Sequence, residues 1–379
     1  MTGENRQIAV VPHSDEEKSL TVQSGEESDF TDDDFEEKQN RRSKTAGPDK
    51  LYTLSLTELY QISYRSKPPI IESLLCAGAY ILAGAPKIGK SFLVTQLAYH
   101  VSTGERLWGF DVRQGSVLYL ALEDSFQRIQ SRMFKMYGVN DADALHFATT
   151  AGKLGNGLEE QLENFVSERP DTRLIIIDTM QKIRANEKQG YAGDYEIIGK
   201  IKAFADDHGL CVLLVHHTRK QPAVDSFNTI SGSTGLLGSA DGAIMMKKKT
   251  RSGTEATLEI SGRDLQDQVL YLKRDMDSML WDLQDAENES QEQQPDPILE
   301  SAAALVSPDH PVWSGSPTEF AEAIHVGMAA NTLTKYMNVN AGRLLEERHV
   351  RYENKPRHTG RKVILTYMVV DTVEYRILE

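Results

Sequence analysis

Apolar and polar residues alternate on two length scales through the middle of the chain. Short, nearly continuous apolar runs predict buried strands at 79–83, 116–122, 144–149, 174–177 and 211–215. Longer stretches with apolar residues at helical spacing predict helices at 92–103, 125–137, 158–169 and 194–208. Strands that are apolar on both faces and separated by helices are typical of a parallel sheet covered on both sides. The pattern predicts an α/β domain with a mostly parallel sheet, extended by partly antiparallel strands at 242–246 and 257–260.

The pattern changes at both ends of this domain. Residues 1–48 are polar, acidic and nearly free of aromatic side chains, which predicts a disordered tail. The α/β domain then covers residues 49–283. A Pro- and Glu-rich stretch at 284–300 predicts a linker to a second domain over 301–379.

The second domain has the pattern of a small α+β fold. Apolar residues between Phe320 and Met337 predict two short helices, and 340–347 predicts a third. Strands are predicted at 350–353 and 362–367, around a turn rich in Pro, Arg, His and Gly. Three helices followed by a basic hairpin is the order of a winged helix, whose third helix enters a groove of duplex DNA. We therefore predict a winged-helix-like domain that is a candidate for binding duplex DNA.

A glycine-rich motif joins the first predicted strand to the first predicted helix. It reads Gly84, Ala85, Pro86, Lys87, Ile88, Gly89, Lys90, Ser91 and fits G-x-x-x-x-G-K-[ST], the phosphate-binding loop or P-loop. The glycines let the backbone wrap so that its N–H groups point at a phosphate, and Lys90 adds positive charge for the β- and γ-phosphates. A strand before the loop and a helix starting near Phe92 are the context that such a site needs. The motif predicts ATP binding by Gly84–Phe92; a turn that binds nothing is the alternative.

A carboxylate ends the predicted strand at 174–177. Asp178 lies there, and the carboxyl ends of parallel strands meet at one edge of a sheet, beside the P-loop. The Ser91 hydroxyl and the Asp178 carboxylate are oxygen ligands suited to the Mg²⁺ that accompanies ATP. The next residue is Thr179, whereas many related ATPases carry a catalytic glutamate at that position. A base that activates water must therefore come from elsewhere.

Glu123 is the favoured base, because it follows the strand at 116–122 and so lies at the same sheet edge. Asp124 is the second choice. The alternative interpretation is that this pair only begins the next helix, which Asp124 or Ser125 would cap well.

Three further features are candidates for the same chemistry. His216 and His217 end the strand at 211–215, where His217 is the favoured sensor of the γ-phosphate and a structural histidine is the alternative. The following loop, 218–238, carries Arg219 and Lys220 and small polar residues, so it either tracks a DNA backbone or is a plain surface loop. Arg263 follows a late strand; it would serve as an arginine finger for a neighbouring subunit if the protein forms a ring, or else pair with Asp264 or another acid.

Bulk composition narrows the function further. The net charge of -14 argues against indiscriminate binding of nucleic acid, although acidic stretches at 15–37 and 282–296 carry much of it. We find no apolar run long enough to span a membrane and no signal-peptide pattern, so we expect a cytoplasmic protein with no membrane partner. Cys76 and Cys211 are expected to be small buried hydrophobes rather than a disulfide or a metal site.

Taken together, these motifs resemble the RecA-like ATPases of the RepA/DnaB replicative helicase group. The segments that carry the resemblance are Gly84–Phe92, Val117–Asp124, Leu174–Thr179, Val215–Lys220 and Ser261–Asp264, which cover residues 70–275 in the family's order and spacing. The similarity is greatest to the RepA-type helicases of plasmids and mobile elements. It implies a RecA-like fold, a hexameric ring, ATP hydrolysis between subunits and single-stranded DNA in the central channel.

The resemblance also implies roles for individual residues. Glu123 would be the base, the histidine pair would sense the γ-phosphate, and Arg263 would act on the site of the next subunit. The leading hypothesis is thus an ATP-driven, ring-forming DNA motor, a replicative helicase of a plasmid, phage or mobile element. The alternative is an ATP-dependent regulatory or recombination-mediator protein that binds DNA without unwinding it.

Overall fold

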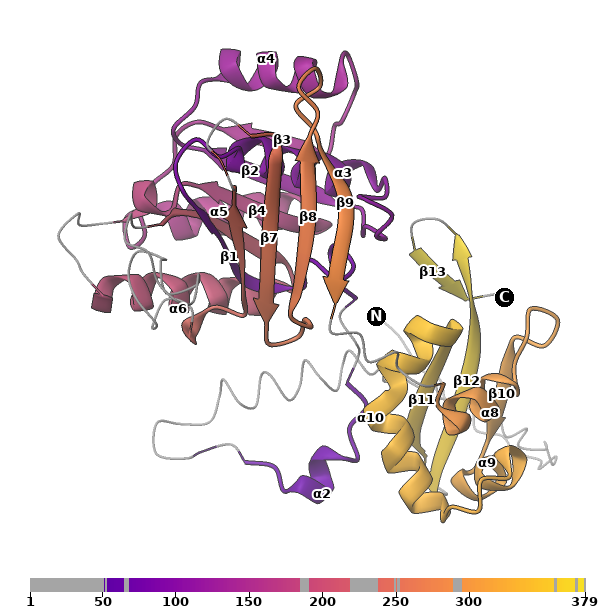
Figure 1. Cartoon of the computed structure of the whole chain (residues 1–379). Helices are drawn as coiled ribbons and strands as arrows, with labels where there is room; N and C mark the ends of the chain where they lie inside the picture. Colours follow the sequence, from indigo (N-terminus) through magenta and orange to yellow (C-terminus); the bar gives the residue numbers. More distant parts are fainter. Residues whose placement is uncertain are drawn as a thin grey trace, which may run out of the picture. The chain divides into compact units, whose positions relative to one another are not determined.

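The fold is described from a computed structural model of the chain (Figure 1). The residues that it describes are 51, 53–64, 68–184, 191–218, 238–248, 250, 253–288, 295–357, 360–371 and 374–377. The predicted tail at 1–48 and most of the loop at 218–238, with Arg219 and Lys220, lie outside these residues. None of the helices within the described ranges is long and apolar enough to cross a membrane.

A nine-stranded sheet forms the centre of the first domain. Its strands lie in the order β3-β2-β4-β5-β1-β6-β7-β8-β9. Their bounds are β1 Gly78–Gly84, β2 Ser116–Ala121, β3 Leu145–Ala148, β4 Thr172–Asp178, β5 Cys211–His217, β6 Gly242–Lys247, β7 Glu255–Gly262, β8 Gln268–Arg274 and β9 Trp281–Asn288. The first six strands of this order are parallel, and β7 to β9 continue the sheet as an antiparallel meander. The α/β architecture with a mostly parallel sheet is as predicted.

Helices cover both faces of the parallel strands (Figure 1). Within the described residues, the helices of this domain are α3 Lys90–Thr103, α4 Phe126–Tyr137, α5 Leu158–Glu168, the short 3₁₀ helix η1 Met180–Ile183 and α6 Tyr191–His208. The short helix α2 Leu56–Leu59 is not one of them, because the Tyr60 carbonyl that follows it accepts from the side chain of Asn338 in the second domain. Successive strand residues point to opposite faces, so each strand supplies two cores. In β1, Tyr80 and Leu82 join the core under α3, whereas Ala79 and Ile81 join the core under α5 and α6.

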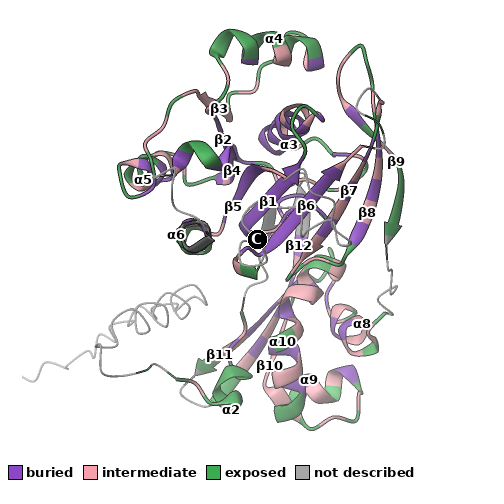
Figure 2. Ribbon diagram, turned by 60° about the vertical axis from the view of Figure 1, so that its left-hand side comes forward, coloured by how far each residue is buried: buried purple, intermediate pink, exposed green. Residues whose placement is uncertain are grey.

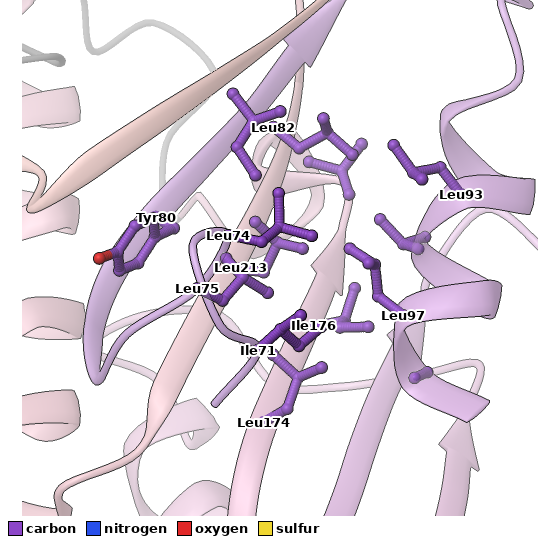
Figure 3. Close-up of a cluster of buried hydrophobic side chains, with 14 of the residues drawn as sticks. Ile71, Leu74, Leu75, Tyr80, Leu82, Leu93, Leu97, Leu174, Ile176 and Leu213 are labelled. Carbon is purple, nitrogen blue, oxygen red and sulfur yellow. The ribbon is translucent and has the colours of Figure 1, made fainter. Parts of the chain in front are cut away.

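The core under α3 fixes the start of that helix against the sheet. Leu93 and Leu97 of α3 are buried against Leu82 of β1 and Leu213 of β5 (Figure 3). In Figure 2 the central strands are buried along their length, whereas α4 presents mostly exposed residues. Burial of whole strands explains why the sequence pattern of this half was continuous rather than alternating.

The second domain combines three helices with a four-stranded sheet. Its helices are α8 Pro297–Ala303, α9 Pro317–Ile324 and α10 Ala330–Arg348, and its strands are β10 Val312–Gly315, β11 Val350–Arg357, β12 Gly360–Asp371 and β13 Glu374–Ile377. β12 pairs with β10, β11 and β13, in each case antiparallel. One core of side chains, including Phe320, Leu333 and Tyr352, holds the helices to the sheet.

Two expectations for this region are corrected. The predicted separate helix at 340–347 is the second half of the continuous α10, because Asn340 satisfies its side-chain amide on the Tyr336 carbonyl and does not interrupt the helix. The expected linker at 284–300 overlaps ordered elements at both ends, since β9 continues to Asn288 and α8 begins at Pro297. Asp296 caps α8 through hydrogen bonds from the backbone N–H groups of Ile298 and Leu299.

Candidate active site

The P-loop lies where the sequence predicted, between β1 and α3. Gly89 has φ 106° and precedes the first residue of α3, and Lys87 also has a positive φ of 66°. A side chain at Gly89 is excluded twice, because that backbone conformation disfavours it and because a Cβ would lie 2.7 Å from Cζ2 of Trp281. The loop therefore directs the N–H groups at the start of α3 toward its own concave side, as a phosphate site requires.

Lys90 points back over the loop. Its ammonium donates to the carbonyls of Gly84 (2.7 Å) and Ala85 (3.0 Å), and it lies 3.1 Å from Nδ1 of His217. An ammonium can only donate, so Nδ1 of His217 is the acceptor and the ring proton is on Nε2. The charge is thus held by neutral acceptors and has no carboxylate within hydrogen-bond distance among the described residues.

Burial changes the pKa of the Lys90 ammonium. Lys90 is only 5% exposed, and this burial lowers its pKa to about 8, although Asp178 and Glu123 act in the opposite direction. Burial and the Lys90 charge likewise lower the pKa of His217. A bound phosphate would stabilise the charged form of Lys90, because it would add an ion pair to an ammonium whose present acceptors are two carbonyls and an imidazole. The same negative charge would favour the protonated form of His217.

Asp178 ends β4 and meets Ser91 across the sheet edge. Its Oδ2 accepts from the Ser91 hydroxyl at 3.0 Å and from the Tyr119 hydroxyl at 3.1 Å. Burial raises the pKa of Asp178, and these two hydrogen bonds act against that rise. The hydroxyl and the carboxylate thus form an adjacent pair of oxygen ligands beside the P-loop, which is the donor chemistry that Mg²⁺ prefers.

Glu123 and Asp124 occupy different environments, although they are neighbours. Glu123 is exposed, and its Oε1 accepts a long hydrogen bond of 3.4 Å from the hydroxyl of Thr179. Asp124 is paired with Arg132 (2.6 Å) and Arg128 (3.2 Å) of α4. The cap of α4 is Ser125, whose hydroxyl accepts from the Arg128 N–H. Glu123 is therefore the carboxylate of the two that remains available to a ligand.

Arg263 does not join this group. It follows the end of β7, and Gly262 pairs with Gly242 at the beginning of β6, so it lies at the edge of the sheet opposite to the P-loop. There its guanidinium donates to the Gly238 carbonyl (3.0 Å) and lies 3.9 Å from the Asp241 carboxylate, while 57% of the side chain is exposed. The alternative expectation, a pair with Asp264 or another acid, is met by Asp241 rather than by Asp264.

Four residues of the site were missed from the sequence. Tyr119 holds Asp178 from the middle of β2, Arg274 and Trp281 pack beside Gly89, and Gln96 accepts from the Trp281 N–H. Tyr119 looked like an ordinary apolar strand residue, and only the alternation of faces along β2 could have placed it beside Asp178. Gln96 was hidden on a buried helix, Arg274 ends the strand β8 that was not predicted, and Trp281 begins β9, whose acidic sequence resembled a linker.

The fold and this geometry support one class of protein, a P-loop ATPase of the RecA-like kind. Its marks are β1 between parallel strands β5 and β6, the P-loop at the tip of β1, and Asp178 and Glu123 at the tips of β4 and β2. Comparison with known proteins agrees: residues 50–223 match the family described as AAA domain.

A curated relative also matches part of the chain. The chain is 26% identical over 148 residues to the DNA repair protein RadA of Aquifex aeolicus (strain VF5). The aligned stretch covers 38% of this chain and 29% of RadA, so the chain spans less than a third of that relative's length. The activity of the whole protein is therefore left to be proposed below.

The residues present fit ATP together with Mg²⁺. The loop amides and Lys90 would hold the phosphates, and Ser91 and Asp178 would hold the ion, which supplies charge neutralisation for the phosphoryl oxygens when bound. Glu123 would orient and deprotonate the attacking water, and Thr179 fixes the direction of its carboxylate. His217, which contacts Lys90, would report the presence of the terminal phosphate to the segment after β5.

Proposed function

We propose that the protein is an ATP-hydrolysing, ring-forming DNA motor, a replicative helicase of a plasmid, phage or mobile element. The observation that carries this proposal is the division of labour at the tip of β2, where Asp124 is bound to α4 and Glu123 is left facing the P-loop. A base in this position, with Thr179 after the magnesium carboxylate, is the arrangement of the RepA-type motors that the motifs resemble.

The position of Arg263 supports a ring. Because it lies at the sheet edge away from its own P-loop, it cannot serve that P-loop without unfolding β7. In a head-to-tail ring, however, one edge of each subunit faces the opposite edge of the next. Arg263 would then stabilise charge at the neighbour's ATP, with a homo-hexamer around single-stranded DNA as the proposed assembly.

The second domain supplies the proposed contact with duplex DNA. Its order of helix, strand, two helices and antiparallel hairpin supports a winged-helix-like role, with α10 as the reading helix. The second candidate function, a regulatory or recombination-mediator ATPase that does not unwind DNA, is favoured by the match to a DNA repair protein.

Two measurements distinguish these functions: strand displacement on a forked duplex and the rate of ATP hydrolysis in the same reaction. The motor predicts unwinding that depends on ATP, and Glu123→Gln should lower hydrolysis by about a hundredfold or more while ATP still binds. Asp124→Asn is the matched control, because it changes the neighbouring carboxylate and should leave hydrolysis within a few-fold. Hydrolysis without unwinding would favour the second candidate, and full hydrolysis by Glu123→Gln would remove Glu123 as the base.

A further inference from the structure

Two cations lie beside the start of α3, and neither forms an ion pair with a carboxylate of the described residues. Arg274 ends β8, and its Nη1 is 3.2 Å from where a Cβ of Gly89 would be. Lys248 follows β6 at the same edge of the sheet. Neither side chain has a role in the ATPase chemistry described above, and neither was predicted as a site residue.

Both cations rest on the same aromatic ring. The Arg274 guanidinium lies 5.4 Å and the Lys248 ammonium 5.3 Å from the centre of the Trp281 ring, and Arg274 also lies 5.6 Å from the Phe92 ring. Trp281 is fully buried, and its indole N–H points to the Gly89 carbonyl at 3.4 Å. The aromatic platform thus fixes two positive charges beside the start of α3, where backbone N–H groups already favour an anion.

Few hydrogen bonds from the described residues reach these two charges. The Arg274 Nε is buried with no hydrogen-bond partner, and the Lys248 ammonium donates only to the Gly253 carbonyl (2.7 Å) among the described residues. Burial and the Arg274 charge together lower the pKa of Lys248. By contrast, the adjacent Lys247 is paired with Glu259.

Nearby carboxylates are committed elsewhere. Asp275, directly after Arg274, accepts hydrogen bonds from the N–H groups of Asp277 and Ser278 in its own turn. Asp282 lies opposite Lys273 in the backbone register of β8 and β9, and no ion pair joins it to Arg274 or Lys248 among the described residues. Within the described ranges, the chain thus holds two like charges together and provides no anion between them.

We propose that Arg274 and Lys248 bind a phosphate group of the nucleoside triphosphate held by the P-loop, as a second phosphate subsite. The inference rests on the proposed ATPase function, because the ligand is the nucleotide of that same site. A guanidinium on an aromatic platform is well suited to phosphate, and the ligand would relieve the repulsion between the two cations. Contact with Gly89 and Phe92 favours the nucleotide over a DNA backbone as the source of this phosphate.

The test compares binding of ATP and of inorganic tripolyphosphate by isothermal titration calorimetry. Arg274→Gln should weaken both ligands by at least tenfold, because the lost contact is to phosphate. Lys248→Gln should do the same to a smaller degree, and Arg274→Lys should recover part of the loss. Lys273→Gln is the matched control, because it removes an exposed charge next to Arg274 on the same strand and should change neither affinity.

Thermal unfolding distinguishes a phosphate-binding role of Lys248 from a purely structural one. Without ligand, Lys248→Gln should be at least as stable as the wild type, because one of two repelling charges is gone, yet ATP should raise its Tm by less. Weakened ATP binding with unchanged tripolyphosphate binding would overturn the proposal in favour of a base contact. Unchanged binding of both, or a loss confined to single-stranded DNA, would also overturn it. Failure of the wild type to bind ATP would instead overturn the proposed function.

Discussion

At the scale of single residues, the two central charged groups of the site form hydrogen bonds only with neutral groups. The Lys90 ammonium is buried on two carbonyls and an imidazole, and the Asp178 carboxylate is buried on two hydroxyls. Both arrangements satisfy hydrogen bonds, but neither neutralises the charge of the group, and burial shifts the pKa of Lys90 downward and that of Asp178 upward. Residues in this condition are typical of ligand sites rather than of structural ion pairs.

The pKa of Lys90 leads to a testable pH dependence of ATP binding. In the free protein its pKa is about 8, and bound phosphate would raise it, so binding takes up a proton above pH 8. The Kd for ATP should therefore be flat below pH 8 and should rise by up to about tenfold per pH unit above it. Fluorescence titration between pH 6.5 and 9.5 measures this, and the slope should disappear in Lys90→Ala; a flat profile in the wild type would contradict the prediction.

Tyr119 makes a second residue-scale prediction. Its hydroxyl is one of two donors to Asp178, and the ring is completely buried. Tyr119→Phe should cost about 1 kcal/mol of folding stability and should weaken Mg²⁺-dependent ATP binding by a few-fold, because the carboxylate loses a positioning contact. Chemical denaturation and ATP titration with and without Mg²⁺ check this. Equal loss of ATP binding in the absence of Mg²⁺ would show that the hydroxyl acts only through stability.

At the scale of elements, the sequence pattern predicts the parallel strands well and the edge of the sheet poorly. β1, β2, β4 and β5 are apolar on both faces, so a continuous run marks each of them. β9 alternates apolar with acidic residues and ends in the Gln- and Glu-rich stretch, so it resembles a linker until β8 is known to pair with it. The residues missed at the site follow from this, since Arg274 and Trp281 belong to those edge strands.

The packing of β9 on the P-loop gives an element-scale prediction. Gly89→Ala would place a Cβ 2.7 Å from the Trp281 ring in a backbone conformation that alanine disfavours. We expect the variant to lose ATP binding by more than tenfold and to unfold at lower temperature. Gly109→Ala is a control at another positive-φ glycine with open space around it, and it should lower stability while sparing ATP binding. Equal effects of the two variants on binding would contradict the role of this packing.

At the scale of the whole molecule, the opposite placement of the P-loop and Arg263 predicts shared active sites. Arg263→Ala should bind ATP normally and hydrolyse it at least tenfold more slowly, because the lost charge acts on a neighbour. The Lys90→Ala variant should be inactive alone. Mixing Arg263→Ala with Lys90→Ala should restore part of the ATPase activity, because some interfaces would combine an intact P-loop from one subunit with an intact Arg263 from the next. No recovery on mixing, or a strict monomer by light scattering with ATP, would contradict the ring.

One consequence follows from the way Gln96 is bonded. Its side-chain amide donates to the Trp281 carbonyl (3.0 Å) and accepts from the Trp281 N–H (2.9 Å), so it pairs with β9 as a further strand would. The Trp108 indole closes on the same carbonyl (2.6 Å). These contacts join α3, the helix that begins at the P-loop, directly to the first residue of β9. A shift of α3 on phosphate binding would therefore also displace the start of β9, the last strand before α8.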